Sequence, residues 1–167
     1  MKEEIRHHFV ECITVYQADF YRLAYSYVKN EADALDIIQD AIQKALLNLN
    51  SIQKPEALKS WFYKIVIRTA IDFLRKNKKL KLVDGETLEL ISQQHVDCYE
   101  DIDLKEALER LPIKYKTIIV LRYFEDLRID EIAEIIGKTS STTKTRLYKA
   151  LQLLRMDIRK EDLFDDK

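Results

Sequence analysis

The stretch EIIGKTSSTTKTRLYKALQLLR, residues 134–155, contains a helical pattern, a break and a second helical pattern. Apolar residues recur at helical spacing on both sides, whereas residues 138–145 carry only hydroxyl and lysine side chains. Gly137 suits a left-handed cap that ends the first helix. Thr139, Ser140 and Ser141 can cap the second helix or donate to phosphate oxygens. A short helix, a glycine turn and a longer helix predict a helix-turn-helix.

The second helix of such a unit enters the major groove of DNA. Its expected inward set is Thr143, Leu147, Ala150, Leu151 and Leu154, and its outer faces carry Lys144, Thr145, Tyr148 and Lys149. Lysines can reach guanine acceptors or phosphates, and the threonine can contact a base edge or a thymine methyl. The alternative for this helix alone is an amphipathic helix with a solvated basic face.

The composition of the whole chain favours helices. Only two glycines and two prolines occur in 167 residues, too few for a fold with many tight turns. Hydrophobic residues make up 47% and charged residues 34%, and no apolar run reaches the ~18 residues of a membrane span. The first residues lack the apolar core of a signal peptide. Cys12 and Cys98 lie far apart, which is typical of reduced thiols, so a cytoplasmic location is expected.

Charge is distributed unevenly, although the formal net charge is only −1. Residues 59–81 carry eight cations and one anion, and residues 138–160 carry seven cations and one anion. Between them, residues 84–109 carry nine acids and one lysine. Two basic blocks separated by an acidic one indicate a protein that touches a polyanion in two places.

The N-terminal half predicts three helices. One apolar stripe covers residues 9–28, and Asn30 with Asp33 resembles a capping box for the next helix. Pro55 suits the first turn of the third helix. The inward set expected for the second helix is Leu35, Ile38, Ala41, Ile42, Ala45, Leu46 and Leu49. The set expected for the third is Leu58, Phe62, Ile65, Val66, Thr69 and Phe73.

The C-terminal part predicts four more helices: residues 104–111, 115–123, 129–136 and the basic helix described first. Tyr115, Ile118, Ile119 and Tyr123 are the inward set of the second of these. The segment between the halves has weak periodicity, and repulsion among its acids favours an extended linker. We therefore expect an all-α protein with two small helical domains at 1–79 and 104–160, an acidic linker at 80–103 and an acidic tail at 161–167.

Two segments in this order resemble an extracytoplasmic-function (ECF) sigma factor of bacterial RNA polymerase. LERLPIKYKTIIVLRYFEDLRIDEIAEIIGKTSSTTKTRLYKALQLLR (108–155) resembles sigma region four. ADALDIIQDAIQKAL (32–46) resembles the helix that binds the polymerase clamp, and WFYKIVIRTAIDFLRK (61–76) resembles the segment that engages the downstream promoter element. Thr143 stands where the family has a valine or a similar apolar residue, and Ile42 where an aromatic residue is frequent.

The resemblance implies two DNA contacts. Region four reads the upstream (−35) element as duplex, here with Lys144, Thr145, Tyr148 and Lys149 at bases and Ser141 and Arg146 at phosphates. Region two reads the downstream (−10) element as single strand and traps a flipped base in the loop at residues 50–55. Asn50, Ser51, Gln53 and Lys54 supply polar groups there and Trp61 an aromatic wall, the chemistry that an unstacked base needs. Arg68, Arg75 and Lys76 are expected at the DNA backbone, with Asp72 orienting an arginine.

The resemblance also implies protein partners. Asp36, Gln39, Asp40 and Gln43 form a polar stripe at helical spacing, with Ile37 beside it, and are expected to bind core RNA polymerase. By itself such a stripe is typical of a solvated face. An inhibitory anti-sigma factor is expected from the family alone. No metal-ligand spacing, phosphate loop or nucleophile–base set stands out, so the sequence predicts no metal, no cofactor and no enzyme.

Two other functions are compatible with parts of the sequence. A helix-turn-helix regulator that dimerises on a duplex operator would account for residues 134–155 but not for the basic third helix or the loop at 50–55. The second alternative function is a helical interaction module whose basic faces bind an acidic protein. A transcription initiation factor that needs no nucleotide hydrolysis accounts for both basic blocks.

Overall fold

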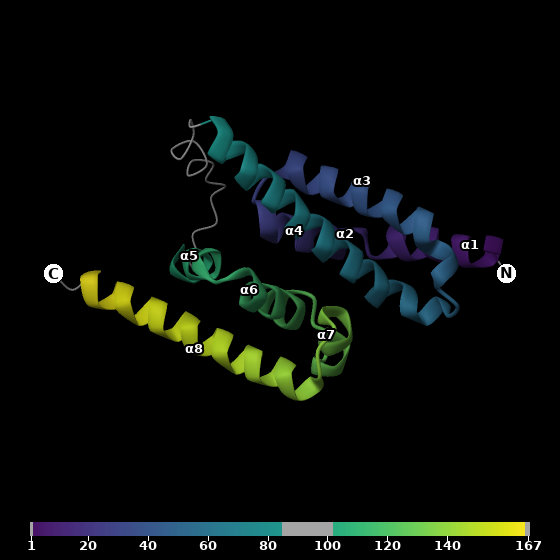
Figure 1. Ribbon diagram of the computed structural model, residues 1–167. Helices are drawn as coiled ribbons and strands as arrows, with labels where there is room; N and C mark the ends of the chain where they lie inside the picture. The colour runs from purple at the N-terminus through teal and green to yellow at the C-terminus, as the bar shows by residue number, and fades with distance from the viewer. Residues whose placement is uncertain (1, 85–101, 166–167) are drawn as a thin grey trace. The chain divides into compact units, whose positions relative to one another are not determined.

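The computed structural model describes residues 2–84 and 102–165, and the parts that it describes contain helices and turns but no strand. The all-α prediction is confirmed. The chain divides into two compact units, the first holding residues 1–84 and the second most of the remaining chain (Figure 1). Within the described ranges, none of the helices is both long enough and apolar enough to cross a bilayer.

The N-terminal unit contains four α-helices and two short 3-10 helices. These are α1 (Lys2–Val15), α2 (Gln17–Val28), α3 (Glu31–Asn48), η1 (Leu49–Ser51), η2 (Pro55–Ala57) and α4 (Leu58–Asp84). Helices α2, α3 and α4 pack against one another in pairs. Helix α1 leads end to end into α2 and contacts α2, α4, η1 and η2 (Figure 1). The predicted domain boundary at residue 79 falls inside α4, and most of the predicted linker, residues 85–101, lies outside the described residues.

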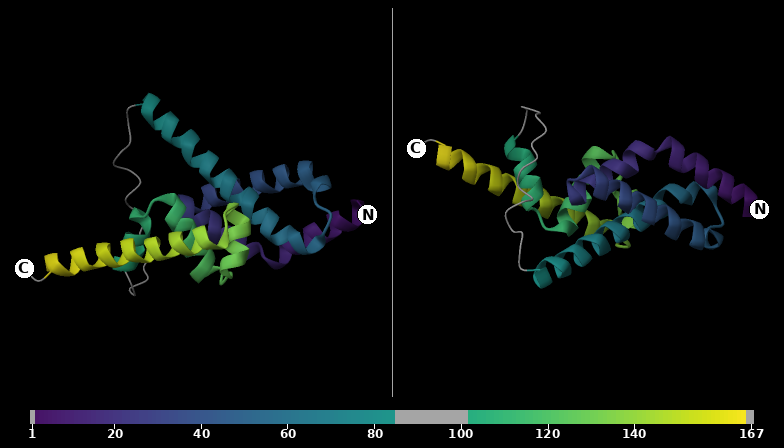
Figure 2. Two further views of the ribbon diagram at one scale, coloured as in Figure 1. Left: turned by 60° about the horizontal axis from the view of Figure 1, so that its bottom comes forward. Right: turned by 90° about the horizontal axis from the view of Figure 1, so that it is seen from above.

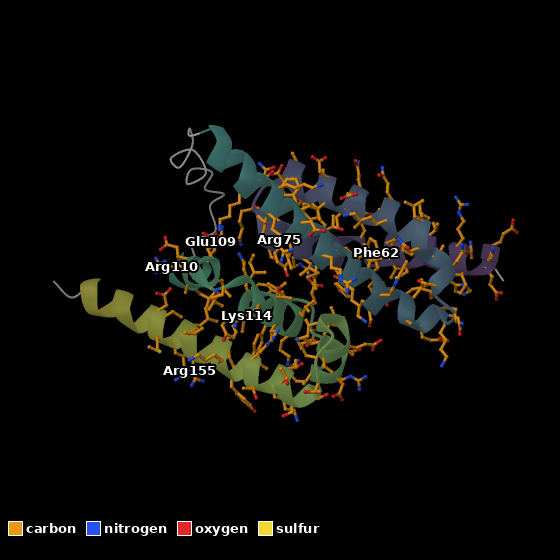
Figure 3. All side chains as sticks on the ribbon, viewed as in Figure 1. Phe62, Arg75, Glu109, Arg110, Lys114 and Arg155 are labelled. Atoms are coloured by element: carbon orange, nitrogen blue, oxygen red, sulfur yellow. The ribbon has the colours of Figure 1, made fainter. Side chains whose placement is uncertain are left out.

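The core of this unit is built around Phe62, which is fully buried (Figure 3). Its ring meets those of Phe9 and Phe20 edge to face, with centroids 5.5 and 4.7 Å away. In a straight helix Phe9 and Phe20 would lie about 16 Å apart along the axis. The helix predicted over residues 9–28 is instead broken at Tyr16, whose φ of −104° and ψ of 19° depart from helical values. This bend lets both rings reach the same partner.

Helix α3 begins as predicted but faces the core differently. Asn30 caps it, since its side-chain oxygen accepts a hydrogen bond from the Asp33 N–H at 2.9 Å. The side chains that α3 buries are Ala34, Ile37, Ala41 and Ala45. Leu35 and Leu46, predicted to point inward, are 52% and 42% exposed. Alanines allow neighbouring helices to approach closely, so α3 turns its small residues toward α2 and α4 and leaves these leucines outside.

The C-terminal unit contains α5 (Ile102–Arg110), α6 (Ile113–Ile119), η3 (Val120–Phe124), α7 (Ile129–Ile136) and α8 (Ser140–Asp165). Helices α5 and α6 pack against the long α8 (Figure 2). The Arg110 guanidinium on α5 forms an ion pair with Asp157 on α8 at 3.1 Å (Figure 3). Helix α8 continues to Asp165, inside the predicted acidic tail.

The helix predicted over residues 115–123 ends in a π-helical turn, η3. The Glu125 N–H donates to the Val120 carbonyl and the Leu127 N–H to the Leu121 carbonyl, both at 3.0 Å. A π turn adds a residue to the helical repeat and rotates the side chains that follow it. Tyr123, predicted to be buried, is therefore 56% exposed, while Ile118 and Ile119 are buried as predicted.

Gly137 ends α7 in the left-handed conformation that its position in the sequence predicts, with φ of +68°. A Cβ added there would meet no atom within 4 Å, so a side chain at this position would destabilise the protein only through the strained backbone conformation. We expect Gly137→Ala to destabilise the C-terminal unit by about 1 kcal/mol. Asparagine tolerates this conformation better, so Gly137→Asn should cost less. Urea unfolding of the full chain followed by circular dichroism measures both, and equal stabilities of all three proteins would contradict the explanation.

Candidate nucleic-acid and polymerase interfaces

The turn between α7 and α8 is fixed by hydroxyl groups. Thr139 caps α8, because its Oγ1 accepts a hydrogen bond from the Thr142 N–H at 3.1 Å. The Ser140 hydroxyl donates to Asp130 on α7 at 2.6 Å and so ties the two helices together. Thr143 is fully buried, and its hydroxyl donates to the Thr139 carbonyl at 2.8 Å, so a polar residue fits this core position. The helix-turn-helix is thereby held in one geometry.

The outer face of α8 carries the side chains predicted to contact duplex DNA. Ser141, Lys144, Thr145, Tyr148 and Lys149 are exposed, and Arg146 is half-buried. The Tyr148 side chain stands 70% exposed, although it is a large aromatic residue. Thr145 donates its hydroxyl to the Ser141 carbonyl at 3.1 Å, which leaves its oxygen lone pairs and its methyl group to a partner. The predicted face is therefore open in this unit.

The loop between α3 and α4 is shaped by its own backbone. The Ile52 N–H donates to the Leu49 carbonyl, and the Ala57 N–H to the Lys54 carbonyl, both at 3.1 Å. The predicted base-contacting residues Asn50, Ser51, Gln53 and Lys54 are all exposed. The Ser51 hydroxyl donates to the Asn48 carbonyl at 2.8 Å and is thus partly used inside the loop.

Trp61 lies on the first turns of α4 and is only partly buried. One edge of its indole meets the Phe9 ring at a centroid distance of 6.2 Å and an interplanar angle of 72°. Its neighbours Phe62 and Tyr63 are buried in the core. Trp61 therefore combines a packing contact with an accessible part, whereas Phe62 serves packing alone.

The basic face of α4 continues the same surface. Arg68, Arg75 and Lys76 are exposed, and Arg75 is held near Asp72, with 3.9 Å between guanidinium and carboxylate (Figure 3). A cavity of about 280 Å³ lies between α3 and α4, lined by Asp40, Lys44, Thr69, Asp72, Phe73, Arg75 and Lys76. Inside it Lys44 pairs with Asp40 at 3.0 Å and lies 3.4 Å from the Thr69 hydroxyl. Residues predicted for polymerase and for DNA thus border one cavity.

The outer face of α3 carries the predicted polar stripe, since Asp36, Gln39, Asp40 and Gln43 are exposed. Ile37, predicted to accompany them, is 1% exposed and belongs to the core. Its place beside the stripe is taken by Leu35, Leu46 and Leu47, which are 52%, 42% and 82% exposed. Leu47 continues the row of Asp36, Asp40 and Gln43 at helical spacing. Helical periodicity predicted a buried place for Leu35 and Leu46, so their part in this face could not be read from the sequence.

Metal ligands and cysteines are the residues that could carry other chemistry in this chain. Among the described residues, no group of three or more His, Cys, Asp or Glu side chains is placed to hold a metal ion. Burial raises the pKa of the half-buried Cys12 thiol, which keeps it protonated and unreactive near neutral pH. Cys98 lies outside the described residues.

Family models and known relatives agree on a class for this chain. The model of sigma-70 region 2 matches residues 12–80, and the model of sigma-70 region 4 matches residues 101–154. The RNA polymerase sigma factor SigV of Bacillus subtilis (strain 168) is 59% identical over 154 residues, which span 92% of this chain and 93% of the relative. The ECF RNA polymerase sigma factor SigW of the same strain is 31% identical over 166 residues, spanning 90% and 89% of the two chains.

A solved structure shares the fold. The sigma factor RpoE from Bartonella quintana, in complex with the anti-sigma factor NepR, superposes with a TM-score of 0.73 at 22% identity. The match covers 90% of this chain and 96% of that one. The chain belongs to the ECF sigma factors of the sigma-70 family. Because the chain contains both sigma region 2 and sigma region 4, the hypothesis of a regulator that acts on duplex operators alone is not favoured.

Proposed function

We propose that this protein binds core RNA polymerase, delivers it to promoters and helps to open the duplex there. The observation that carries the proposal is the presence of two exposed basic surfaces in two separate units. One surface lies on a helix-turn-helix suited to duplex DNA, and the other surrounds an open loop beside a partly exposed tryptophan. A duplex-only regulator needs the first surface but has no use for the second.

Helix α8 supplies the duplex contact. Its exposed residues Lys144, Thr145, Tyr148 and Lys149 face away from the core and meet base edges in the major groove of the upstream element. Ser141 and Arg146 lie where backbone phosphates pass. Lys144 and Lys149 also contribute to a salt-dependent attraction, since each neutralised phosphate adds about 0.9 to the slope of log affinity against log salt.

The η1–η2 loop and α4 supply the single-strand contact. Asn50, Ser51, Gln53 and Lys54 hydrogen-bond the edges of an extruded base of the downstream element, and the open part of Trp61 stacks on a base face. Arg68, Arg75 and Lys76 hold the adjacent phosphates. Strand opening is driven by the capture of unstacked bases and phosphates, with no nucleotide hydrolysis.

The outer face of α3 binds core polymerase. Exposed polar residues accompanied by exposed leucines on the same helix have the composition of a protein interface, which combines apolar area with polar groups. Asp36, Gln39, Asp40 and Gln43 fix the register, and Leu35, Leu46 and Leu47 contribute apolar area.

An anti-sigma factor is a further expected partner. One structural neighbour is the sigma factor RpoE in complex with the anti-sigma factor NepR, and a second is CnrH in complex with the cytosolic domain of CnrY. We propose that a protein of this kind holds the present chain inactive by covering its polymerase-binding face.

The test of the proposed function is transcription by core polymerase with and without the purified protein on a fragmented genomic library. We expect a small set of transcripts that start at defined positions and appear only when the protein is added. If no such transcripts appear and the free protein binds a palindromic duplex tightly, the regulator hypothesis replaces this one.

The exposed leucines give a specific prediction for the polymerase contact. Leu47→Ser removes a side chain that contacts little within its own unit but would be buried by the polymerase. We expect core affinity to fall at least about tenfold, since full burial of a leucine contributes about 1.5–3 kcal/mol. Val15→Ser, at a position 71% exposed on α1, is the matched control. Titration of labelled protein with core polymerase measures both, and equal losses would place the interface elsewhere.

A further inference from the structure

The only tryptophan of the chain, Trp61, is packed by a residue from the first helix. Phe9 on α1 is 1% exposed, and its ring contacts those of Trp61 and Phe62 at centroid distances of 6.2 and 5.5 Å. Edge-to-face contacts of this kind favour one orientation of each ring relative to the other. Phe9 therefore contributes to the orientation of the indole, in addition to filling the core.

Helix α1 also supports the loop. It packs against η1 and against η2, which are the two ends of the segment that displays Asn50, Gln53 and Lys54 (Figure 2). The backbone hydrogen bonds of the loop are short-range, so they shape each end but do not hold the two ends together. The packing of α3 against α4 brings the two ends together, and the contacts of α1 with both η1 and η2 add a second connection between them.

Helix α1 is itself fastened at several points. Ile5 and Phe9 are buried on its inner side. Tyr16 follows the last residue of α1, and the Lys59 ammonium group lies 3.7 Å from the centre of its ring. This cation–π contact joins the α1–α2 bend to the first turn of α4. Lys59 precedes Trp61 by two positions. The bend and the tryptophan are thus held to the same turn of helix.

We propose that α1 is a brace for the surface that captures unpaired DNA, with Phe9 as its positioning residue for Trp61. The inference rests on the proposed function of the loop and assigns a role to a segment that largely precedes residues 12–80, the part matched by the region 2 model. Phe9 itself touches no DNA. Its effect is to hold Trp61 and both ends of the loop in one arrangement before a base arrives, which lowers the entropic cost of capture.

The variant that tests this is Phe9→Leu, which keeps an apolar side chain in the core and removes the aromatic edge. Val10→Ala, at the adjacent and 55% exposed position, is the control. In the free protein, fluorescence reports on Trp61 alone because the chain has no other tryptophan. We expect Phe9→Leu to shift this emission to longer wavelength without loss of helical circular dichroism, and Val10→Ala to leave it unchanged.

The functional readout uses holoenzyme on a promoter recovered from the transcription test. Permanganate reactivity of unpaired thymines measures opening, and binding to the same promoter with its downstream element already unpaired measures capture. We expect Phe9→Leu to lower both about tenfold, as a small misplacement of contacting groups does. Core affinity and the binding of the upstream duplex element should stay as in the wild type.

Different failures have different meanings. If wild-type holoenzyme leaves no thymines unpaired, the proposed function itself is wrong. If wild type opens the promoter and Phe9→Leu opens it equally well despite a shifted Trp61 emission, the brace is overturned and the function stands. A parallel loss of core affinity, or an unchanged emission, would also overturn it, because Phe9 would then act on general stability or would not position Trp61.

Discussion

Holoenzyme carrying Lys144→Glu together with Lys149→Glu is expected to lose promoter-directed transcription about a hundredfold, since a contact to a base is worth about 1–3 kcal/mol. Both lysines are exposed on α8, so their replacement leaves the core of the C-terminal unit intact. Each substitution turns an attraction to DNA into a repulsion. Transcription from a recovered promoter, measured over a range of salt concentrations, should also show a shallower salt dependence of binding.

The control for this variant is Lys105→Glu together with Arg155→Glu. These two residues are exposed in the same unit and give the same change of net charge, and Arg155 lies on α8 itself (Figure 3). We expect a loss several times smaller, from the change of overall charge alone. Equal losses in the two doubly substituted proteins would mean that general electrostatic attraction, and not the outer face of α8, guides the protein to DNA.

Phe62→Ala is expected to have the largest effect on stability. Phe62 is fully buried and its ring contacts Phe9 and Phe20, so truncation leaves a cavity where three aromatic rings meet. Substitutions of this kind cost about 3–5 kcal/mol, a large part of the stability of a small helical unit. Unfolding of the full chain followed by Trp61 fluorescence measures the change in the N-terminal unit.

A matched comparison for Phe62→Ala is Tyr148→Ala. Both remove an aromatic ring from a helix, but Tyr148 is 70% exposed and should cost little stability. Its loss should appear in the affinity for the upstream element instead. An unchanged unfolding midpoint for Phe62→Ala would contradict the core described for the N-terminal unit.

The helix-turn-helix could be predicted in detail because its signals are local. A glycine with a positive φ, a hydroxyl cap and an apolar repeat each act within one or two turns of helix. Gly137 and the buried set Thr143, Leu147, Ala150 and Leu154 occupy the places that the sequence indicates. The local sequence at this turn is therefore compatible with few backbone conformations other than the observed one.

The phase of α3 could not be predicted in the same way. Its sequence offers more apolar residues than one face can bury, and periodicity alone favours the larger ones. Tertiary packing selects the alanine side, because the gain comes from close approach to α2 and α4. The exposed leucines of α3 are then the strongest indication of a protein partner. Only the structure distinguishes them from core residues.

The bend at Tyr16 and the π turn at Val120–Phe124 could not be predicted for a different reason. Both change the direction of side chains partway along a continuous apolar pattern, so the helical spacing of apolar residues does not indicate where the change occurs. The bend at Tyr16 is explained by contacts between distant segments, because it lets Phe9 and Phe20 both reach Phe62. The spacing of apolar residues along one helix does not reveal contacts with a distant segment.

Site-specific cross-linking within a single promoter complex tests the central claim most directly. A photoreactive amino acid would replace Tyr148 in one protein and Gln53 in another, and each holoenzyme would be irradiated on the same recovered promoter. We expect cross-links from position 148 to the upstream duplex and from position 53 to an unpaired strand downstream. Cross-links from both positions to duplex DNA of the same element would contradict it.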